Sequence, residues 1–230
     1  MIALPFQDRP PRDHLDQAGI NAERQLAHYL GRQFADDSRV DLFFGLRIPL
    51  DRATGSRQDA VQMDALLIHC HGIAIIESKS VHDEVRVNKR GEWSRTWKGK
   101  ALGMRSPVEQ VKQQADALRT LLQTNRTKLR GKVNLGLMQG GFRGCPIECF
   151  VAISDSGRIT RDPPDSVPEV MKADQIADRV RKRVDRHQKF GGFVGLLRHA
   201  IANEESDDGL WSMTQEERGR VKEFLVNSKG

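Results

Sequence analysis

The sequence predicts an α/β domain in which helices flank a mixed central β-sheet, with a helical C-terminal extension. Three observations predict it. Short apolar segments between residues 40 and 79 have the length and the β-branched content of strands. The segments 106–122 and 214–225 each begin with a capping residue and carry apolar residues at helical spacing. The 230 residues are enough to bury one sizeable core.

The first half of the chain predicts a helix followed by strands. After an irregular start that contains proline, residues 19–31 are expected to form a helix and residues 40–50 a strand. Turn residues place a loop at 51–57. The segments 61–68 and 73–76 are then expected to pair as a hairpin. Cys149–Ser154 predicts a late buried strand, and the glycine-rich 131–144 before it a loop.

This hairpin fixes the position of an acidic motif. We expect His71-Gly72 to form its two-residue turn, because glycine accepts a positive φ. In that register Asp64 lies opposite Lys79, and Glu77 shares their face because side chains alternate along a strand. The apolar run Ile73–Ile76 indicates a strand buried on both faces. Charged groups at its end must therefore be paired or bind a ligand.

The motif has the chemistry of a metal-dependent phosphodiesterase. Two neighbouring carboxylates, Asp64 and Glu77, repel each other and favour a bound cation. Oxygen ligands suit Mg²⁺ or Mn²⁺, and Mg²⁺ needs only one or two protein carboxylates. Lys79 can stabilise the charge on a phosphate and orient or deprotonate an attacking water. The pattern predicts hydrolysis of a phosphodiester bond, with DNA as the expected substrate.

The helix that follows begins with a strong signal. Ser106 can cap it, Pro107 suits its first turn, and Glu109 has the spacing of a capping box. Gln110 and Gln114, four residues apart, share a face that differs from the apolar stripe. Gln110 beside Lys79 would be placed to hydrogen-bond a water, and the alternative is a surface glutamine.

Together these residues resemble the PD-(D/E)xK, restriction-endonuclease-like fold and, within it, the nuclease-related domain (NERD) family. The family pattern places an acid on the first helix, Asp on a strand, Glu-x-Lys on the next strand and Gln on a later helix. In this chain the positions are Glu23, Asp64, Glu77, Lys79 and Gln110. The likeness implies a nuclease domain at 1–160 with its core at 19–154, and a mainly helical extension at 161–230, packed on or linked to that core.

The resemblance also implies a role for each position. Asp64, Glu77 and the backbone carbonyl of Ser78 would hold Mg²⁺ or Mn²⁺. Glu23 would hold a metal-bound water, and Lys79 and Gln110 would position the nucleophile. The helix motif Gly-x-x-Gly-Glu appears here as Gly19-Ile-Asn-Ala22-Glu23, with alanine at the second glycine.

A basic segment with tryptophans follows the motif. Its cations and aromatic residues are Arg86, Lys89, Arg90, Trp93, Arg95, Trp97, Lys98 and Lys100. Cations gain affinity for phosphates by releasing counterions, and an indole can stack on a base. Two interpretations stay open, a nucleic-acid-contacting flap and an amphipathic hairpin whose charges are solvated.

Composition limits the remaining classes. The formal net charge is +6, and no apolar run approaches the ~20 residues of a membrane helix. The start lacks an apolar signal core, so a cytoplasmic protein without membrane contact is expected. Cys70, Cys145 and Cys149 cannot form a closed disulfide set and are expected to be buried thiols. Alternation separates His69 and His71 from Cys70, which disfavours zinc there.

Two rivals to a DNA nuclease remain. One is a nucleic-acid-binding or scaffold module on a nuclease-like fold, with a weak or inactive site, since fold does not imply function. The other is an RNA-directed nuclease, because no sequence feature senses a 2′-hydroxyl. The sequence leaves a homo-oligomer open.

Overall fold

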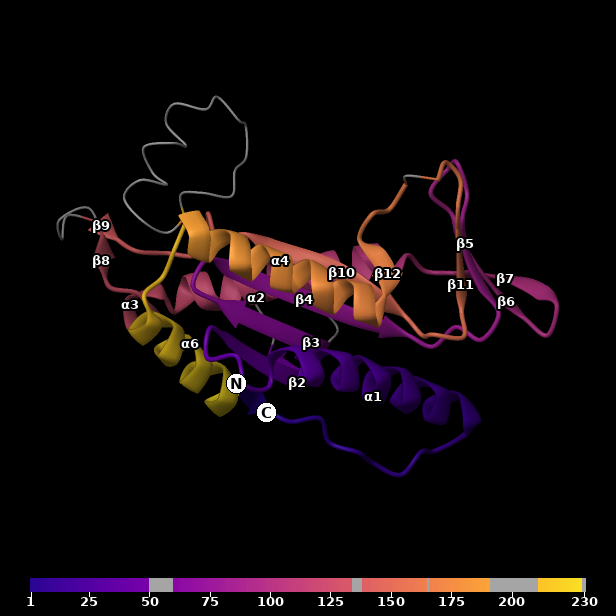
Figure 1. Cartoon of the computed structure of the whole chain (residues 1–230), viewed down its shortest axis with the longest axis horizontal. Helices are drawn as coiled ribbons and strands as arrows, with labels where there is room; N and C mark the ends of the chain where they lie inside the picture. Colours follow the sequence, from indigo (N-terminus) through magenta and orange to yellow (C-terminus); the bar gives the residue numbers. More distant parts are fainter. Residues whose placement is uncertain (50–59, 134–137, 165, 191–210, 229–230) are drawn as a thin grey trace.

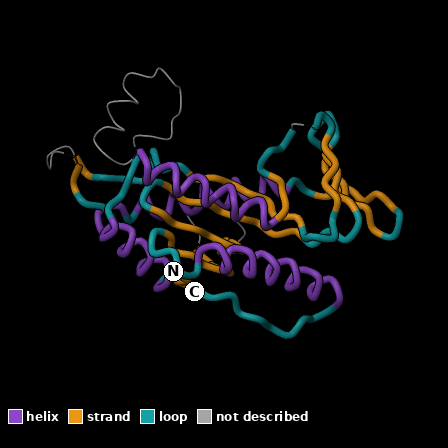
Figure 2. The backbone as a smooth tube through the Cα atoms, viewed as in Figure 1, coloured by secondary structure: helices purple, strands orange, loops and turns teal. Residues whose placement is uncertain are grey.

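The computed structural model describes residues 1–49, 60–133, 138–164, 166–190 and 211–228. A six-stranded sheet with the order β1-β2-β3-β4-β10-β12 forms its centre, and helices cover both faces (Figure 1). A second sheet, β11-β5-β6-β7, stands at one end of the first (Figures 1 and 2). Both sheets mix parallel and antiparallel pairs. The structure confirms the predicted α/β fold of the restriction-endonuclease-like type.

The central sheet combines an antiparallel meander with parallel neighbours. Its strands are β1 (Ile2–Leu4), β2 (Val40–Pro49), β3 (Ala60–His69), β4 (Gly72–Lys79), β10 (Ile147–Ile153) and β12 (Val170–Lys172). β2, β3 and β4 pair antiparallel, whereas β4, β10 and β12 run parallel. The predicted strands at 40–50 and 149–154 are confirmed within the described residues. Leu50 and the predicted loop 51–57 lie outside them.

The described helices are α1 (His14–Phe34), α2 (Pro107–Thr124), α3 (Arg126–Leu129), α4 (Ala173–Phe190) and α6 (Gln215–Asn227). α1 begins before the predicted residue 19 because the Asp13 side chain caps it, accepting from the amides of Leu15 and Asp16 at 2.8 Å. Ser106 caps α2 as predicted, and Thr214 forms a capping box with Glu217 in α6. None of these helices is long and apolar enough to cross a membrane.

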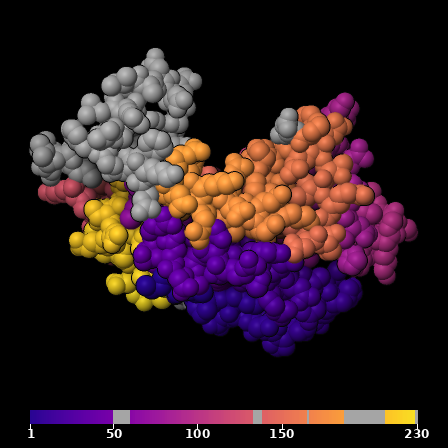
Figure 3. All heavy atoms as spheres, viewed as in Figure 1, coloured from indigo at the N-terminus to yellow at the C-terminus, as the bar shows by residue number. Residues whose placement is uncertain are grey.

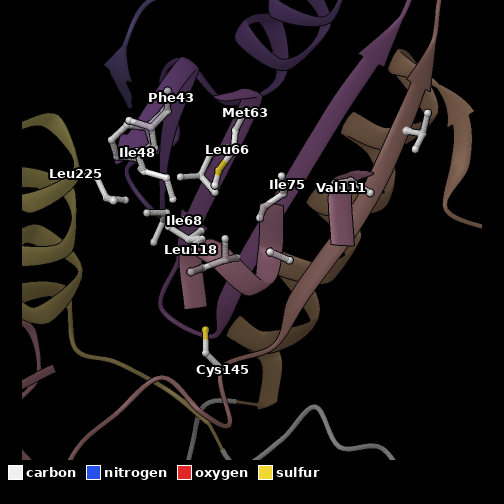
Figure 4. Close-up of a cluster of buried hydrophobic side chains, with 14 of the residues drawn as sticks. Phe43, Ile48, Met63, Leu66, Ile68, Ile75, Val111, Leu118, Cys145 and Leu225 are labelled. Carbon is white, nitrogen blue, oxygen red and sulfur yellow. The ribbon is translucent and has the colours of Figure 1, made fainter. Parts of the chain in front are cut away.

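Each face of the central sheet has its own hydrophobic cluster. Leu30 of α1 and Ile176 of α4 pack on one face, against residues such as Ile76. On the other face Val111 of α2 and Leu225 of α6 belong to one cluster with sheet residues, drawn in Figure 4. Helices from the predicted C-terminal extension thus contribute to both faces of the core.

The second sheet projects beyond the helical layers, as the magenta atoms of Figure 3 show. It consists of β5 (Glu84–Val87), β6 (Trp93–Trp97), β7 (Lys100–Met104) and β11 (Arg158–Arg161). The hairpin expected for the basic segment is present as β5 and β6, with β11 beside β5 and β7 beside β6. The strands β5, β6 and β7 together form the basic hairpin. The predicted loop at 131–144 contains a short ladder of β8 (Lys132–Val133) and β9 (Met138–Gln139).

The turn between β3 and β4 corrects a prediction. His69 pairs with Gly72 and Ala65 with Ile76, so Cys70 and His71 form the turn, not His71-Gly72. Gly72 lies inside β4, where a Cβ would stand 2.9 Å from the carbonyl oxygen of Pro146. Glycine is therefore needed for close backbone approach and not for a positive φ. The two-residue shift places Asp64 level with Glu77 instead of Lys79.

The three cysteines are free thiols, but only Cys145 is fully buried, whereas Cys70 and Cys149 are half-buried; the prediction of buried thiols is therefore confirmed for Cys145 alone. Burial raises the pKa of Cys145 to about 12 and the pKa of Cys149 to about 11. Their thiolate fraction at neutral pH is therefore very small, and neither residue has the character of a nucleophile.

Candidate active site

The predicted site residues come from four elements that meet near the end of β4, next to the second sheet. They are Glu23 on α1, Asp64 on β3, Glu77 and Lys79 on β4, and Gln110 on α2. The ladder of β3 and β4 ends at Ala65 and Ile76, one step before the two acids. The acids therefore lie where the main-chain pairing of the two strands stops.

Side-chain alternation is interrupted at Asp64. Met63 and Leu66 belong to the same hydrophobic cluster, although strict alternation would place them on opposite faces. On β2, Gly45 stands across from this point with φ of +61°, a conformation that glycine adopts readily. The Asp64 carboxylate turns toward β4, where Oδ2 accepts hydrogen bonds from the Ser78 amide at 2.7 Å and the Ser78 hydroxyl at 2.8 Å.

Glu77 is a buried carboxylate surrounded by donors. It is 5% exposed. Its Oε1 accepts from Lys79 Nζ at 2.6 Å and from Gln110 Nε2 at 2.6 Å, and its Oε2 accepts from Gln114 Nε2 at 2.7 Å. Lys79 Nζ also donates to Gln110 Oε1 at 3.0 Å. These contacts satisfy the buried charge through one cation and two amides.

The three acids act on one another electrostatically. Burial raises the pKa of Asp64 to about 7, and the charge of Glu77 raises it too, while the Ser78 amide lowers it. Burial also raises the pKa of Glu23, with Arg9 opposing and Glu77 adding to the rise. Glu23 makes no hydrogen bond within the described residues, so its link to the site is through charge. Negative potential therefore gathers where the three elements meet.

The donor set fits a hard divalent cation. Asp64 Oδ1 makes no hydrogen bond to any described residue, and the repulsion from Glu77 would be relieved by positive charge. Across the described ranges no group of three or more His, Cys, Asp or Glu side chains could hold a metal, at this site or around His69 and His71. Two carboxylates suffice for Mg²⁺, which keeps several waters.

Gln114 is the site residue that the sequence did not single out. Its side chain is 4% exposed, and Nε2 donates to Glu77 and, at 3.0 Å, to the carbonyl of Gln62. The available signal was its four-residue spacing from Gln110, which places both amides on one helix face. The structure thus adds a second amide contact to Glu77.

The two tryptophans of the basic hairpin differ in burial. Trp97 is 37% exposed, but Trp93 is 7% exposed and belongs to the hydrophobic cluster that includes Val111 of α2. Burial therefore corrects the expectation that Trp93 contacts nucleic acid, and indicates a core residue. Trp97 pairs with Lys100 and Arg95 with Leu102, so these four side chains share one face of the hairpin.

The other predicted cations of the hairpin are exposed, namely Arg86, Lys89, Arg90 and Lys98. Lys98 occupies the turn of β6 and β7 with φ of +50°, followed by Gly99. β7 ends at Met104 and α2 begins at Pro107, so the basic hairpin leads directly into the helix that carries Gln110.

Comparison with known proteins identifies the family of the chain. The family described as nuclease-related domain (NERD) matches residues 18–154, more than half of the chain. The matched span includes the acids, Lys79, both glutamines of α2 and the basic hairpin. It confirms the resemblance drawn from the sequence. No curated protein and no solved structure matches the chain.

Proposed function

The chain belongs to the nuclease-related domain family, and from that membership we propose that it is a divalent-metal-dependent nuclease that hydrolyses phosphodiester bonds in DNA. One observation carries the proposal. Asp64 and Glu77 lie side by side at the end of a ladder, with Lys79 held on Glu77 at 2.6 Å. Paired acids beside a lysine can hold a cation and face a phosphate. An ion pair with a purely structural role would not require the second acid.

Asp64, Glu77 and the Ser78 carbonyl would hold Mg²⁺ or Mn²⁺, which when bound neutralises phosphate charge and lowers the pKa of water. Lys79 uses two of its three N–H donors on Glu77 and Gln110. The third can reach a phosphate oxygen, because 24% of the side chain is exposed. Water forms a bond to phosphorus in line with the P–O bond that breaks; the proton of the water passes to solvent, and the departing oxygen takes a proton from solvent.

The exposed cations of the hairpin and Trp97 are proposed to bind the nucleic-acid backbone and bases. They are Arg86, Lys89, Arg90, Arg95, Lys98 and Lys100. Their exposure leaves them available for phosphate contacts, which give affinity without sequence preference. The short connection from β7 to α2 would bring a bound strand toward Lys79 and Gln110.

The test is cleavage of supercoiled plasmid and of labelled single-stranded DNA and RNA with Mg²⁺ or Mn²⁺. We expect cutting by the wild type, none with EDTA, and a loss on the order of 10²-fold or more for Lys79→Ala. Lys112→Ala is the matched control, since Lys112 is exposed on α2 and, among the described residues, forms an ion pair with Glu109 alone, at 3.3 Å. Near-normal cleavage by Lys79→Ala would contradict the mechanism, and cutting of RNA alone would reassign the substrate.

One observation favours a second candidate, a nucleic-acid-binding module without catalysis. The charge of Glu77 is already balanced by Lys79, and Gln110 and Gln114 donate hydrogen bonds to it. A carboxylate whose charge and hydrogen bonds are already satisfied by protein groups does not need a metal cation. Binding of DNA without cutting, by both the wild type and Lys79→Ala, would establish this second function.

A further inference from the structure

Helix α2 presents two glutamines to Glu77, one for each carboxylate oxygen. Gln110 is exposed, donates to Oε1 and accepts from Lys79. Gln114 is buried and donates to Oε2. The two amides therefore have different environments, and only Gln110 lies where solvent or substrate can reach it.

Gln114 joins the two strands that carry the acids. Its Nε2 donates both to Glu77 Oε2 on β4 and to the carbonyl oxygen of Gln62 on β3, two positions before Asp64. The β3–β4 ladder has ended at Ala65 and Ile76, so main-chain pairing no longer fixes the distance between the strands here. The amide of Gln114 spans this opening from the helix side.

The remaining atom of the amide is not stabilised. Gln114 Oε1 is buried and has no hydrogen-bond partner among the described residues. Leaving a buried amide oxygen unpaired is unfavourable. The orientation of Gln114 is therefore dictated by its two acceptors, Gln62 and Glu77, and not by a network that satisfies the glutamine itself.

We propose that Gln114 is a positioning residue that fixes the Glu77 carboxylate relative to Asp64 and so sets the geometry of the acid pair. The inference rests on the proposed function, because the pair is there assigned to metal binding. A glutamine suits this role uniquely among similar side chains. Glutamate would repel Glu77, methionine has no N–H donor, and asparagine is one methylene too short to span both acceptors from α2.

The variants Gln114→Met and Gln114→Asn test the proposal, with Gln113→Met as control. Gln113 is exposed on the neighbouring helix position. Mn²⁺ alone is titrated calorimetrically into each metal-free protein, thermal unfolding is recorded, and crystal structures of the metal-free wild type and Gln114 variants are compared. We expect the Kd for Mn²⁺ to rise about 10–100-fold in both Gln114 variants and to stay unchanged in Gln113→Met.

In the metal-free structures of the Gln114 variants we expect the Glu77 carboxylate to leave its wild-type position relative to Asp64. An unmoved carboxylate together with an unchanged Kd would overturn the proposal, even if the midpoint of unfolding fell, because that result describes a merely structural residue. If Gln114→Met does not fold, Gln114→Asn decides by the same criteria. Failure of the wild type to bind Mn²⁺ would overturn the metal assignment, and the metal-free structures would then decide the role of Gln114.

Discussion

Ser78 donates two hydrogen bonds to the same oxygen of Asp64, one from its backbone nitrogen at 2.7 Å and one from its hydroxyl at 2.8 Å. Ser78, which lies between Glu77 and Lys79 in the motif, therefore holds the Asp64 side chain of the neighbouring strand against β4. Because both bonds favour the ionised carboxylate, they oppose the rise in the pKa of Asp64 that burial causes. The middle residue of Glu-x-Lys has a physical role in this protein.

Replacing Ser78 by alanine should weaken Mn²⁺ binding about 10-fold at pH 7. The variant keeps the amide donor but loses the hydroxyl, so the pKa of Asp64 rises further and less of the carboxylate is ionised. The deficit should narrow as the pH rises from 6 to 8, because both proteins then approach full ionisation. Calorimetric titration across this range measures it. Ser78→Thr, which retains a hydroxyl, should bind as the wild type does, and a deficit that is independent of pH would contradict the explanation.

Asp64→Asn should stabilise the metal-free protein at high pH. The pKa of Asp64 in the folded protein is raised from 3.8 to about 7. Its contribution to stability is therefore fully present below its ordinary pKa and is lost as the pH rises through 7. Asparagine avoids this loss, so at pH 8 the variant should exceed the wild type by on the order of 2–4 kcal/mol. Urea unfolding from pH 4 to 8 measures the difference.

That difference should close as the pH falls toward 4. The control is Asp83→Asn, whose side chain is 43% exposed and contacts His82; its unfolding free energy should follow the wild type at every pH. A constant advantage of Asp64→Asn at all pH values would show that the amide packs better and that titration of Asp64 is not the cause.

The two tryptophans of the hairpin should respond to substitution in opposite ways. Trp97→Ala should weaken binding of single-stranded DNA about 10-fold, since one stacked base contributes about 1–3 kcal/mol, and leave stability unchanged. Trp93→Ala should lower the unfolding free energy by about 3–5 kcal/mol, because its buried indole leaves a cavity. Fluorescence anisotropy with a labelled oligonucleotide and urea unfolding measure the two effects. Unaltered DNA binding by Trp97→Ala would favour a hairpin whose charges are only solvated.

The C-terminal helix should unfold together with the sheet. Leu225 is fully buried in the cluster that includes Val111, and Glu217 holds the Gly131 amide at 2.7 Å. Leu225→Ala should lower the unfolding free energy by about 2–5 kcal/mol in a single transition. Val226→Ala, at a position 37% exposed, should have little effect. Two separate transitions by circular dichroism and fluorescence would instead support an extension that folds independently of residues 1–160.

The sequence predicted the two strands of the central hairpin but not their register. Strand pattern placed Asp64 and Glu77 on neighbouring strands, and the register error of two residues preserved their parity. The interruption of side-chain alternation at Asp64 was not predicted. The register error arose because glycine is common in turns, so Gly72 was assigned to the turn. Its actual constraint is the approach of Pro146, which is far away in sequence and invisible before the fold is known.

Two further differences have the same origin in tertiary contact. Trp93 and Trp97 are indistinguishable in a basic segment, and only the packing of β6 against the core separates them. Gln114 has a polar side chain on a helix, which usually faces solvent. Its burial depends on two acceptors from β3 and β4, and local sequence does not specify where those strands diverge.

The connection between β7 and α2 consists of Arg105 and Ser106 alone. A change in the hairpin that displaces the end of β7 therefore also displaces the start of α2, and with it the side chain of Gln110. The hairpin therefore cannot be exchanged independently of α2. A chimaera that takes the hairpin from a relative must also take the first turns of α2 from that relative. We therefore expect sequence changes in the hairpin and at the start of α2 to occur together within the family.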